Sequence, residues 1–315
     1  MTNKPLRVVF MGTPDFAVPS LNVLIENPLT EVVAVVTQPD RPKGRGRKLM
    51  FPPVKEAAVA AGITVLQPES IKTEEMFHTL KELAPDLMVV VAFGQFLPES
   101  LLKLPPCGCV NVHASLLPKY RGAAPIHWAI MNGETVTGVT TMYMDKGMDT
   151  GDMILKAETA IPADMTTGTL HDVLMLQGAN LLSETVALIA AGKAPREKQI
   201  AEEATYAALL KRSTERIQWK RTAQEIHNQV RGLNPWPGAF AKTDSMNLKI
   251  WQTRVLDDAQ TGTAGMIVAC TEKGFVVQTG KGLLEIVEVQ PESKRKMTAQ
   301  ECLCGYCIHP GDTLK

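Results

Sequence analysis

We predict an α/β chain in which a Rossmann-like domain, built on a parallel sheet, is followed by a small antiparallel β-barrel. The first observation is that an apolar run, a turn, a helical pattern and a second apolar run open the chain, as in a doubly wound sheet. The second is that the run Asp86–Ala92 is apolar on both faces after its first residue, which is typical of a central parallel strand. The third is that short alternating runs, separated by glycine turns about ten residues apart, fill the last third of the chain.

The first half of the chain alternates strand and helix patterns. A short apolar strand over Leu6–Met11 ends at the turn residues Gly12–Asp15. The elements expected after it are a helix over Phe16–Glu26, a strand over Val32–Val36, a helix over Pro53–Ala61, a short strand at Val65, a helix over Glu74–Leu83 and the strand over Asp86–Ala92. The first loop has only Gly12 of a G-x-G-x-x-G fingerprint, which argues against a nicotinamide enzyme.

The segment Thr37–Met50 differs from its surroundings in its charge. It carries one acid, Asp40, and its basic residues are Arg41, Lys43, Arg45, Arg47 and Lys48. Its two prolines and two glycines predict a long loop without regular structure. The loop follows the second strand, at the carboxyl edge where ligands bind in open α/β sheets. It is therefore either a solvated loop or one that contacts phosphates of a nucleic acid or of a phosphorylated substrate.

Polar side chains interrupt the apolar pattern of the strand predicted over Cys109–His113. Because successive side chains of a strand point to opposite faces, Asn111, His113 and Ser115 share one face, and valines occupy the other. Single asparagines and histidines are often satisfied structural groups, so this face is either a polar cap on the sheet or part of a site.

The rest of the first domain contains one short acidic segment. The elements expected here are a helix over Ile126–Met131 with Pro125 in its first turn, strands over Thr137–Met144 and Ile154–Lys156, and a long amphipathic helix over Thr167–Ala191. Between the two strands, Asp145–Asp152 has three acids and two glycines. The spacing does not match an EF-hand calcium loop, so we expect a turn that holds one functional carboxylate.

The pattern changes after the long helix. Polar and charged residues over Ala191–Ala204 predict an interdomain linker. A helix is expected over Ala223–Arg231, followed by a rigid aromatic and proline corner at Asn234–Phe240. The alternating runs assigned to the barrel are Ala241–Thr243, Leu248–Trp251, Gly265–Cys270, Gly274–Thr279 and Gly282–Val289.

Composition limits the classes of function. The 315 residues are enough for two domains. Lysine and arginine together number 33, as do aspartate and glutamate, so any binding of nucleic acid depends on local patches rather than on the overall charge. The first ten residues lack an apolar signal segment, and no continuous apolar run is long enough to span a membrane. We therefore expect a cytoplasmic protein with reduced cysteines.

Three of the six cysteines lie close together near the end of the chain. Cys302, Cys304 and Cys307, with His309 beyond them, could supply soft ligands for zinc. The group stands alone, without a second paired knuckle. We therefore expect these residues to be tail thiols, and we expect no metal.

The central stretch and its surroundings resemble the formyltransferases that use 10-formyltetrahydrofolate. The residues that carry this resemblance are Asn111, His113, the run Ser115–Pro118, the run Arg121–Ile126 and the loop Met148–Asp152. The narrower match is to members that act on initiator tRNA, through Gly12–Phe16, Thr37–Pro42 and Asn234–Pro237. The resemblance covers nearly the whole chain in the right order, and only the tail cysteines stand outside it.

The resemblance implies an organisation and a reaction. It implies a Rossmann-like formyltransferase domain over residues 1–190, a linker over 191–205 and an OB-like tRNA-binding β-barrel over 206–315. The implied reaction moves the formyl group of 10-formyltetrahydrofolate, a co-substrate, to the α-amino group of methionine on initiator tRNA, for translation initiation. Neither a metal nor a membrane is implied, and a monomer is expected.

The resemblance also implies catalytic roles. An amine that attacks a formyl carbon produces a developing oxyanion, which needs a hydrogen-bond donor, and it loses a proton, which needs a base or a relay. Asn111 would donate to the oxyanion, and His113 would bind the same oxygen or pass a proton. Asp149 would orient and polarise His113 or accept a proton through water.

Binding residues follow from the same resemblance. The folate would lie at the carboxyl edge of the sheet, against Ser115, Leu116, Leu117 and Pro118, with Phe93 and Gly94 nearby. For Phe93, an ordinary core position is the alternative. The basic loop would contact the end of the tRNA through Arg45 and, more weakly, through Arg41 and Lys43. The barrel and linker would hold the inside of the tRNA by its shape and phosphates.

Three other functions compete with this interpretation. A formyltransferase of the same fold could act on an amino-sugar nucleotide, although it would not need a basic loop of this length. A hydrolase could release formate from 10-formyltetrahydrofolate with water as the nucleophile. A folate- or RNA-binding module without catalysis is the third, and the complete set of Asn111, His113 and Asp149 argues against it.

Overall fold

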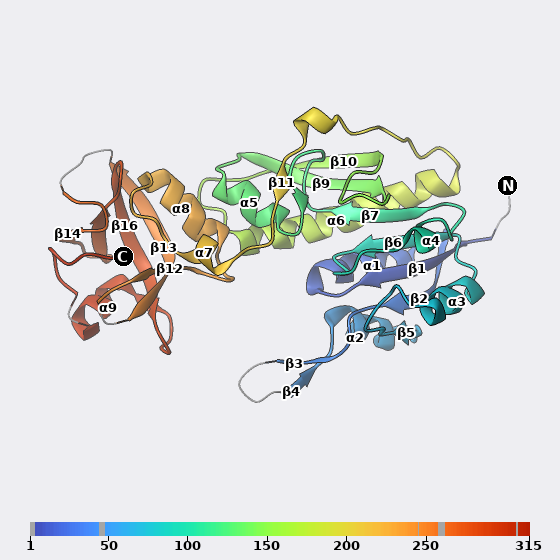
Figure 1. Cartoon of the computed structure of the whole chain (residues 1–315), viewed down its shortest axis with the longest axis horizontal. Coiled ribbons are helices and arrows are strands. Elements are labelled where there is room, and N and C mark those ends of the chain that lie inside the picture. Colours follow the sequence, from blue (N-terminus) through green and yellow to red (C-terminus); the bar gives the residue numbers. More distant parts are fainter. Residues whose placement is uncertain (1–3, 44–47, 245, 258–261, 307) are drawn as a thin grey trace. The chain divides into compact units, whose positions relative to one another are not determined.

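The computed structural model describes residues 4–43, 48–244, 246–257, 262–306 and 308–315. Packing divides the chain into two compact units (Figure 1). The first unit comprises residues 1–122, 137–159 and 171–206, and the second comprises residues 123–136, 160–170 and 207–315. The sequence pattern instead assigned everything before residue 191 to one domain.

The first unit is built on a seven-stranded, mostly parallel sheet. Its strand order is β10-β9-β7-β6-β1-β2-β5. Strands β1, β2, β5, β6 and β7 run parallel, and β9 pairs antiparallel with β7. Every residue of β6 is buried, which confirms the central parallel strand. The strand bounds are β1 Leu6–Gly12, β2 Thr30–Val36, β5 Val65–Leu66, β6 Leu87–Val91, β7 Cys109–His113, β9 Val136–Tyr143 and β10 Met153–Ala160.

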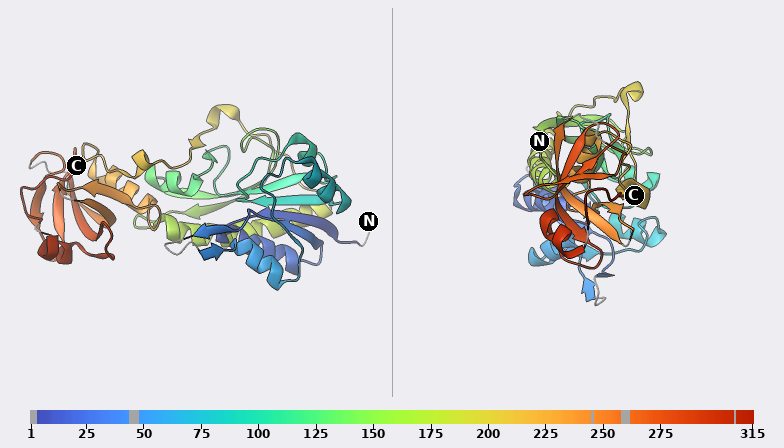
Figure 2. Two further views of the ribbon diagram at one scale, coloured as in Figure 1. Left: turned by 60° about the horizontal axis from the view of Figure 1, so that its bottom comes forward. Right: turned by 90° about the vertical axis from the view of Figure 1, so that its left-hand side faces the viewer.

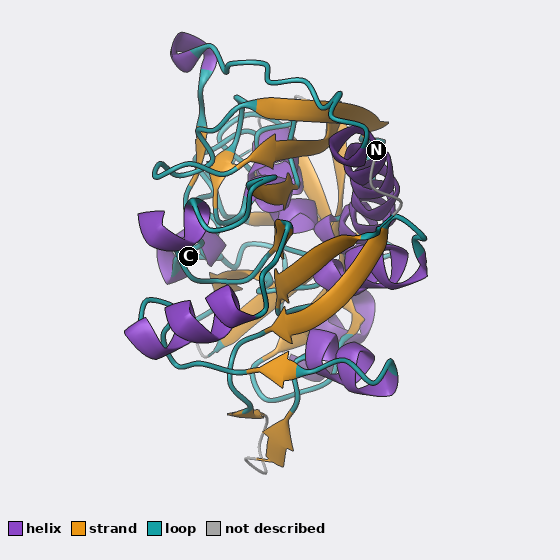
Figure 3. Cartoon of the chain, turned by 90° about the vertical axis from the view of Figure 1, so that its right-hand side faces the viewer, coloured by secondary structure: helices purple, strands orange, loops and turns teal. Residues whose placement is uncertain are grey.

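Helices cover both faces of this sheet (Figure 3). On one face, Leu80 of α3 and Leu101 of α4 share a buried cluster with the strand residues Val9 and Met88. On the other, Gly178 brings α6 close to the side chains of β7 and β9. The bounds of the helices of the first unit are η1 Asp15–Ala17, α1 Val18–Glu26, α2 Pro53–Ala60, α3 Glu74–Glu82, α4 Glu99–Leu102 and α6 Thr167–Ala190, whereas α5 Pro125–Met131 belongs to the second unit.

Helix α6 is the one helix among the described residues that is long and apolar enough to cross a membrane by length and composition. Its apolar residues Leu174, Leu182 and Val186 are fully buried within the protein. The helix therefore has the packing of a core helix.

The predicted loop over Thr37–Met50 proved to be partly wrong. Its two ends form a short antiparallel ribbon, in which β3 Arg41–Lys43 pairs with β4 Lys48–Met50. The hairpin projects from the rest of the first unit (Figure 2). Pro42 is tolerated because a two-stranded ribbon leaves one edge of each strand unpaired, so a missing N–H disrupts no ladder.

The second unit contains an antiparallel sheet that closes on itself. Its strand order is β12-β13-β16-β15-β14, and β17 pairs with β16. The segment 312–315 bonds to both outer strands: Lys315 exchanges backbone hydrogen bonds with Lys242 of β12, and Leu314 donates to Gly265 beside β14. This closure gives the predicted barrel. The strand bounds are β12 Ala239–Lys242, β13 Asn247–Asp257, β14 Ile267–Cys270, β15 Phe275–Gln278, β16 Leu283–Pro291 and β17 Met297–Thr298.

Apolar contacts explain why residues 123–136 belong to the second unit. Met131 of α5 is buried in the same cluster as Ile226 of α8 and Ile250 of the barrel, and Trp128 packs against that cluster. A Cβ on Gly232 would come within 2.6 Å of the Met131 side chain, so α8 lies close against α5. The elements not yet given are β8 Arg121–Gly122, η2 Ala201–Glu203, β11 Tyr206–Ala207, α7 Arg212–Glu215, α8 Ala223–Gly232 and α9 Ala299–Tyr306.

Gly138 in β9 offers a test of the packing between β9 and β10. A Cβ at this position would lie 2.0 Å from the carbonyl oxygen of Ala157, an atom of the backbone that cannot move aside cheaply. We expect Gly138→Ala to lower the free energy of unfolding by about 1–3 kcal/mol, measured by urea denaturation. Gly305→Ala in α9 is the control, because no described atom lies within 4 Å of that position, and it should be neutral or stabilising by up to about 1 kcal/mol. Equal stability of the two variants would contradict the packing.

Candidate active site

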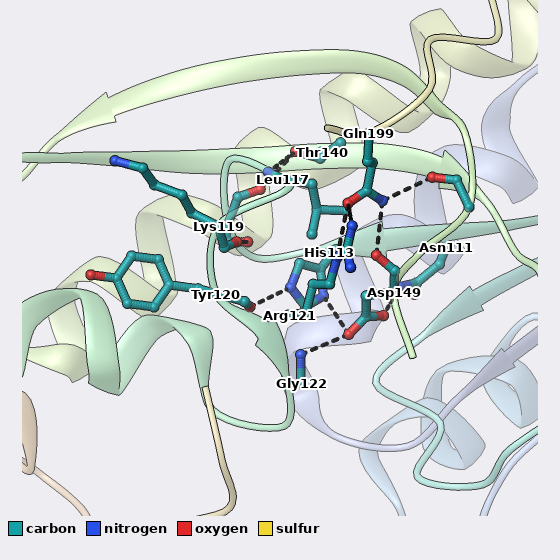
Figure 4. A network of polar contacts seen from close by, with 12 residues as sticks. Asn111, His113, Leu117, Lys119, Tyr120, Arg121, Gly122, Thr140, Asp149 and Gln199 are labelled. Atoms are coloured by element: carbon teal, nitrogen blue, oxygen red, sulfur yellow. Dashed lines mark hydrogen bonds and ion pairs between the residues drawn. The ribbon is translucent and has the colours of Figure 1, made fainter. Parts of the chain in front are cut away.

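Strand β7 and the loop between β9 and β10 bring three polar side chains together. Asn111 and His113 lie two residues apart on β7 and so share a face. Asp149 reaches them from the loop that precedes β10. Figure 4 shows the Asp149 carboxylate beside both side chains. His113 is 6% exposed, and Asn111 and Asp149 are half-buried, so the group combines shielding from water with access.

The Asp149 carboxylate is the centre of this group. Its Oδ1 lies 3.5 Å from the amide nitrogen Nδ2 of Asn111. Its Oδ2 lies 3.7 Å from Nδ1 of His113 and accepts a hydrogen bond of 2.8 Å from the backbone N–H of Gly122. The contacts with Asn111 and His113 are at or beyond the length of a good hydrogen bond, which leaves both groups available to a substrate.

The ring of His113 has a defined orientation. Its Nε2 lies 2.9 Å from the carbonyl oxygen of Tyr120. A carbonyl only accepts, so Nε2 must carry a proton when this bond forms. In the neutral ring, Nδ1 is then the unprotonated nitrogen, and it faces Asp149 across 3.7 Å. Nδ1 is therefore the atom of His113 that can exchange a proton at the site.

Asp149 is held in an unusual backbone conformation. Its φ is +53°, in the left-handed region that aspartate adopts less readily than glycine. Two residues later, Gly151 packs so tightly that a Cβ would lie 1.8 Å from the carbonyl oxygen of Tyr143. Asp145 fixes the start of the loop by accepting from Gly147 and Thr150. The three acids of the loop thus have different roles, and only Asp149 joins Asn111 and His113.

The run Ser115–Pro118 is fixed by hydrogen bonds rather than free to adapt. Ser115 is fully buried and donates to the carbonyl of Lys119. Thr140 of β9 donates to the carbonyl of Ser115 and accepts from the N–H of Leu117. Leu117 is buried, whereas Leu116 and Pro118 are half-buried. Leu116 and Pro118 are therefore the residues of this run with side-chain surface to offer.

Phe93 and Gly94 lie at the carboxyl end of β6. The Phe93 side chain is 2% exposed and belongs to the core of the first unit. Its carbonyl accepts hydrogen bonds from Thr13 and from the Gln38 side chain. Gly94 is exposed and has φ +86°. The backbone at this position, and not the aromatic ring, faces the edge of the sheet.

The base of the hairpin is organised around Asp40. Its carboxylate accepts from Lys55 at 2.5 Å and from Gln67 at 2.8 Å, and these bonds lower the pKa of Asp40. Arg41 is exposed. Arg45 and the side chain of Lys43 lie outside the described residues. Asp40 pairs with Lys55, and Arg41 makes no ion pair within 4 Å among the described residues.

The two tail cysteines that the structure describes lie in different environments. Cys302 is buried in the core of the second unit, where burial raises the pKa of its thiol to about 11, whereas Cys304 is exposed. Cys307 lies outside the described residues. Within the described ranges, no three histidine, cysteine or acidic side chains are grouped to hold a metal ion.

The structure also places two residues at the site that sequence reasoning assigned no role. Gln199, in the polar segment 191–205, donates to the carbonyls of Asp149 and Gly151 and accepts from the guanidinium of Arg121. A single glutamine in a polar segment gives no periodic signal. Arg121 enters the sequence analysis only as the first residue of the run Arg121–Ile126, without a role for its side chain. Their proximity depends on long-range contacts that one sequence does not reveal.

Comparisons with known proteins identify a family for both parts of the chain. Residues 6–186 match the family described as formyl transferase, and residues 209–307 match formyl transferase, C-terminal domain. The chain is 53% identical to methionyl-tRNA formyltransferase of Acetivibrio thermocellus over 310 residues, covering 98% of this chain and 99% of that protein. It is also 53% identical to methionyl-tRNA formyltransferase of Moorella thermoacetica over 309 residues, with the same two coverages.

A solved structure shares the fold. A sugar 3N-formyl transferase, crystallised in the presence of dTDP and 5-N-formyl-THF, superposes with a TM-score of 0.66. It is 20% identical, and the match covers 93% of this chain and all of that one. At this identity the likeness concerns the fold alone.

Proposed function

The chain belongs to the formyl transferase family and catalyses the methionyl-tRNA formyltransferase reaction of its full-length relatives, and we propose that Asn111, His113 and Asp149 are its catalytic residues. The observation that carries this proposal is the position of the Asp149 carboxylate, within 3.5 Å of the Asn111 amide and 3.7 Å of the His113 ring. One amide donor, one proton carrier and one carboxylate are the groups that acyl transfer to an amine requires.

Each residue has a separate task in this mechanism. Asn111 donates from Nδ2 to the formyl oxygen, on which negative charge develops as the methionine amine attacks. A bond forms between the amine nitrogen and the formyl carbon, and the bond from that carbon to the folate nitrogen breaks. His113 takes the proton from the amine at Nδ1 and returns it to the departing nitrogen. Asp149 stabilises the imidazolium that exists between these two proton transfers.

The formyl donor in this proposal is 10-formyltetrahydrofolate. Formyl transferases use formyl-tetrahydrofolate, and structural relatives include a protein in complex with tetrahydrofolic acid. We propose that Leu116 and Pro118 contact the folate through side chains, and that Ser115 and Leu117 hold this run in place. The contribution of Phe93 and Gly94 comes from their backbone, because the Phe93 ring is buried in the core.

The acceptor in this proposal is initiator methionyl-tRNA, held by the hairpin of the first unit and by the barrel. The guanidinium of Arg41 is exposed and makes no ion pair with another described residue, which supports phosphate contact, and Lys43 and Arg45 extend the same basic segment. In function, we propose that residues 1–190 carry catalysis, that 191–205 serve as a linker and that the part from 206 binds tRNA. We also propose that the protein is cytoplasmic and is a monomer in solution.

We expect Arg41→Ala to raise the KM for tRNA by about tenfold and to leave kcat nearly unchanged. The reason is that a lost phosphate contact weakens binding but not chemistry, and it lowers the dependence of log(kcat/KM) on log salt by about one unit. Steady-state rates between low and high salt measure both effects. Lys81→Ala, a change of an exposed cation on α3, is the control and should match the unmodified enzyme. A salt dependence unchanged in Arg41→Ala would remove the hairpin from the tRNA site.

One assay tests the function as a whole. Labelled 10-formyltetrahydrofolate is incubated with methionyl initiator tRNA, uncharged tRNA, an amino-sugar nucleotide or no acceptor. Label should appear on methionyl-tRNA only. Label on the sugar nucleotide would support the related sugar enzyme, and release of formate without an acceptor would support the hydrolase.

A further inference from the structure

Gln199 connects the polar segment 191–205 to the loop that carries Asp149. Its Nε2 donates to the carbonyl oxygen of Asp149 and to that of Gly151, both at 2.8 Å. Its Oε1 accepts from Nε and Nη2 of Arg121 at 3.0 and 2.7 Å. An arginine can only donate and a carbonyl can only accept, so the amide has one possible orientation. The carbonyl and the amino group of this amide thus both form hydrogen bonds (Figure 4).

The charge of Arg121 strengthens the two bonds that Gln199 donates. Arg121 is 5% exposed, and no carboxylate lies within 4 Å of its guanidinium among the described residues. Its positive charge therefore acts on the Gln199 carbonyl, and this polarises the amide and makes its N–H groups better donors. Arg121, Gln199 and the carbonyl of Asp149 form one continuous chain of hydrogen bonds.

Asp149 benefits from such support because its backbone lies in the left-handed region. Aspartate tolerates φ +53° better than most residues do, but less readily than glycine, so contacts from its surroundings help to hold it there. Gln199 holds the backbone of Asp149 from one side, and the N–H of Gly122 holds its carboxylate at 2.8 Å from the other. Gly122 directly follows Arg121 in the chain. The segment Arg121–Gly122 therefore supports Asp149 directly, through the Gly122 N–H, and indirectly, through the bonds from Arg121 to Gln199.

We propose that Gln199 is a positioning residue that sets the place of the Asp149 carboxylate, with Arg121 fixing and polarising its amide. This inference rests on the proposed catalytic role of Asp149. A displacement of about 1 Å at a reacting group can lower the rate about a hundredfold. Loss of Gln199 thus affects kcat and leaves substrate affinity almost unchanged.

The test compares two glutamines with the same kind of bonds. Gln199→Glu is nearly isosteric and keeps the pairing with Arg121, but a carboxylate cannot donate to the two carbonyls. The control is Gln177→Glu, because Gln177 likewise donates to a backbone carbonyl, that of Glu158 at the far end of β10. Gln199→Met, which removes every hydrogen bond of the amide without adding a charge, is a second variant in case Gln199→Glu folds poorly.

Two measurements decide the outcome. We expect kcat to fall about 10- to 100-fold in both Gln199 variants, with each KM within about threefold of the original and Gln177→Glu unaffected. Hydrogen exchange of the Gly122 amide should speed up at least about tenfold, because its acceptor, the Asp149 carboxylate, moves away. Thermal unfolding should stay close to that of Gln177→Glu.

The exchange measurement separates this inference from the proposed function. Asp149→Ala is its positive control, because it deletes the acceptor of the Gly122 amide outright. If Asp149→Ala keeps full activity, the catalytic assignment fails, and Gly122 exchange still reports whether Gln199 holds the loop. Unchanged Gly122 protection or an unchanged kcat in both Gln199 variants overturns the positioning role.

Discussion

Replacing His113 by alanine is expected to lower kcat by about 10²- to 10⁴-fold, the range that a positioned proton carrier contributes. His113 is nearly fully buried, its Nε2 is fixed on the Tyr120 carbonyl and its Nδ1 faces Asp149. No other ring nitrogen within the described site can take its place. Asp149→Ala should cause a similar loss, because the imidazolium would lose its carboxylate partner. Single-turnover formyl transfer to methionyl-tRNA measures both variants.

A change of fold has to be separated from this effect. The matched control is His78→Ala on α3, where the imidazole is exposed, lies 3.8 Å from Glu74 and meets the ring of Phe77 edge to face. Circular dichroism of His113→Ala should show native helix and strand content, since one ring is removed from the edge of the sheet. Retention of more than about a tenth of the rate in His113→Ala would contradict its role as the proton carrier.

Replacing Asn111 by alanine is expected to lower kcat by about 10²- to 10³-fold, which is typical for loss of one oxyanion donor. The Asn111 amide lies 3.5 Å from Asp149, a contact weak enough to be exchanged for a bond to the substrate. The KM for either substrate should change little, because the charge on the oxygen develops only in the transition state.

Asn111→Asp sharpens the same prediction. Aspartate has the size of asparagine, but it cannot donate in its ionised form and brings a second negative charge next to Asp149. We therefore expect it to lose more activity than Asn111→Ala. Asn27→Ala, which removes a half-buried amide just after α1, is the control for loss of an asparagine. If Asn111→Asp were more active than Asn111→Ala, the amide would be acting through packing and not as a donor.

Local patterns predicted the strands and the catalytic face, because each depends on residues close together in the chain. The fully apolar run of β6 and the alternation in β7 lead directly to a central strand and to Asn111 and His113 on one side. The left-handed backbone of Asp149 could not be predicted, because packing of Gly151 and bonds from Gln199 impose it.

Two causes account for the parts that sequence reasoning missed. The segment Thr37–Met50 is rich in proline, glycine and charge, which favours a loop and conceals the pairing of β3 with β4. The segment 191–205 is rich in polar and charged residues, so nothing in it distinguished Gln199 from a solvated residue. Helix α5 was predicted correctly as a helix. Its apolar partners, however, lie about a hundred residues later in the sequence, which is the length of a small domain, so the local pattern could not show them.

The place of α5 determines how this chain can be divided. A gene fragment cut after residue 205 would encode Trp128 and Met131 without the residues of α8 and the barrel that cover them. Its complement would encode a barrel whose core lacks Met131. Both pieces would then expose apolar surface and tend to aggregate when produced separately. The two pieces should therefore be produced together in one cell, and not isolated one by one, so that each covers the apolar surface of the other.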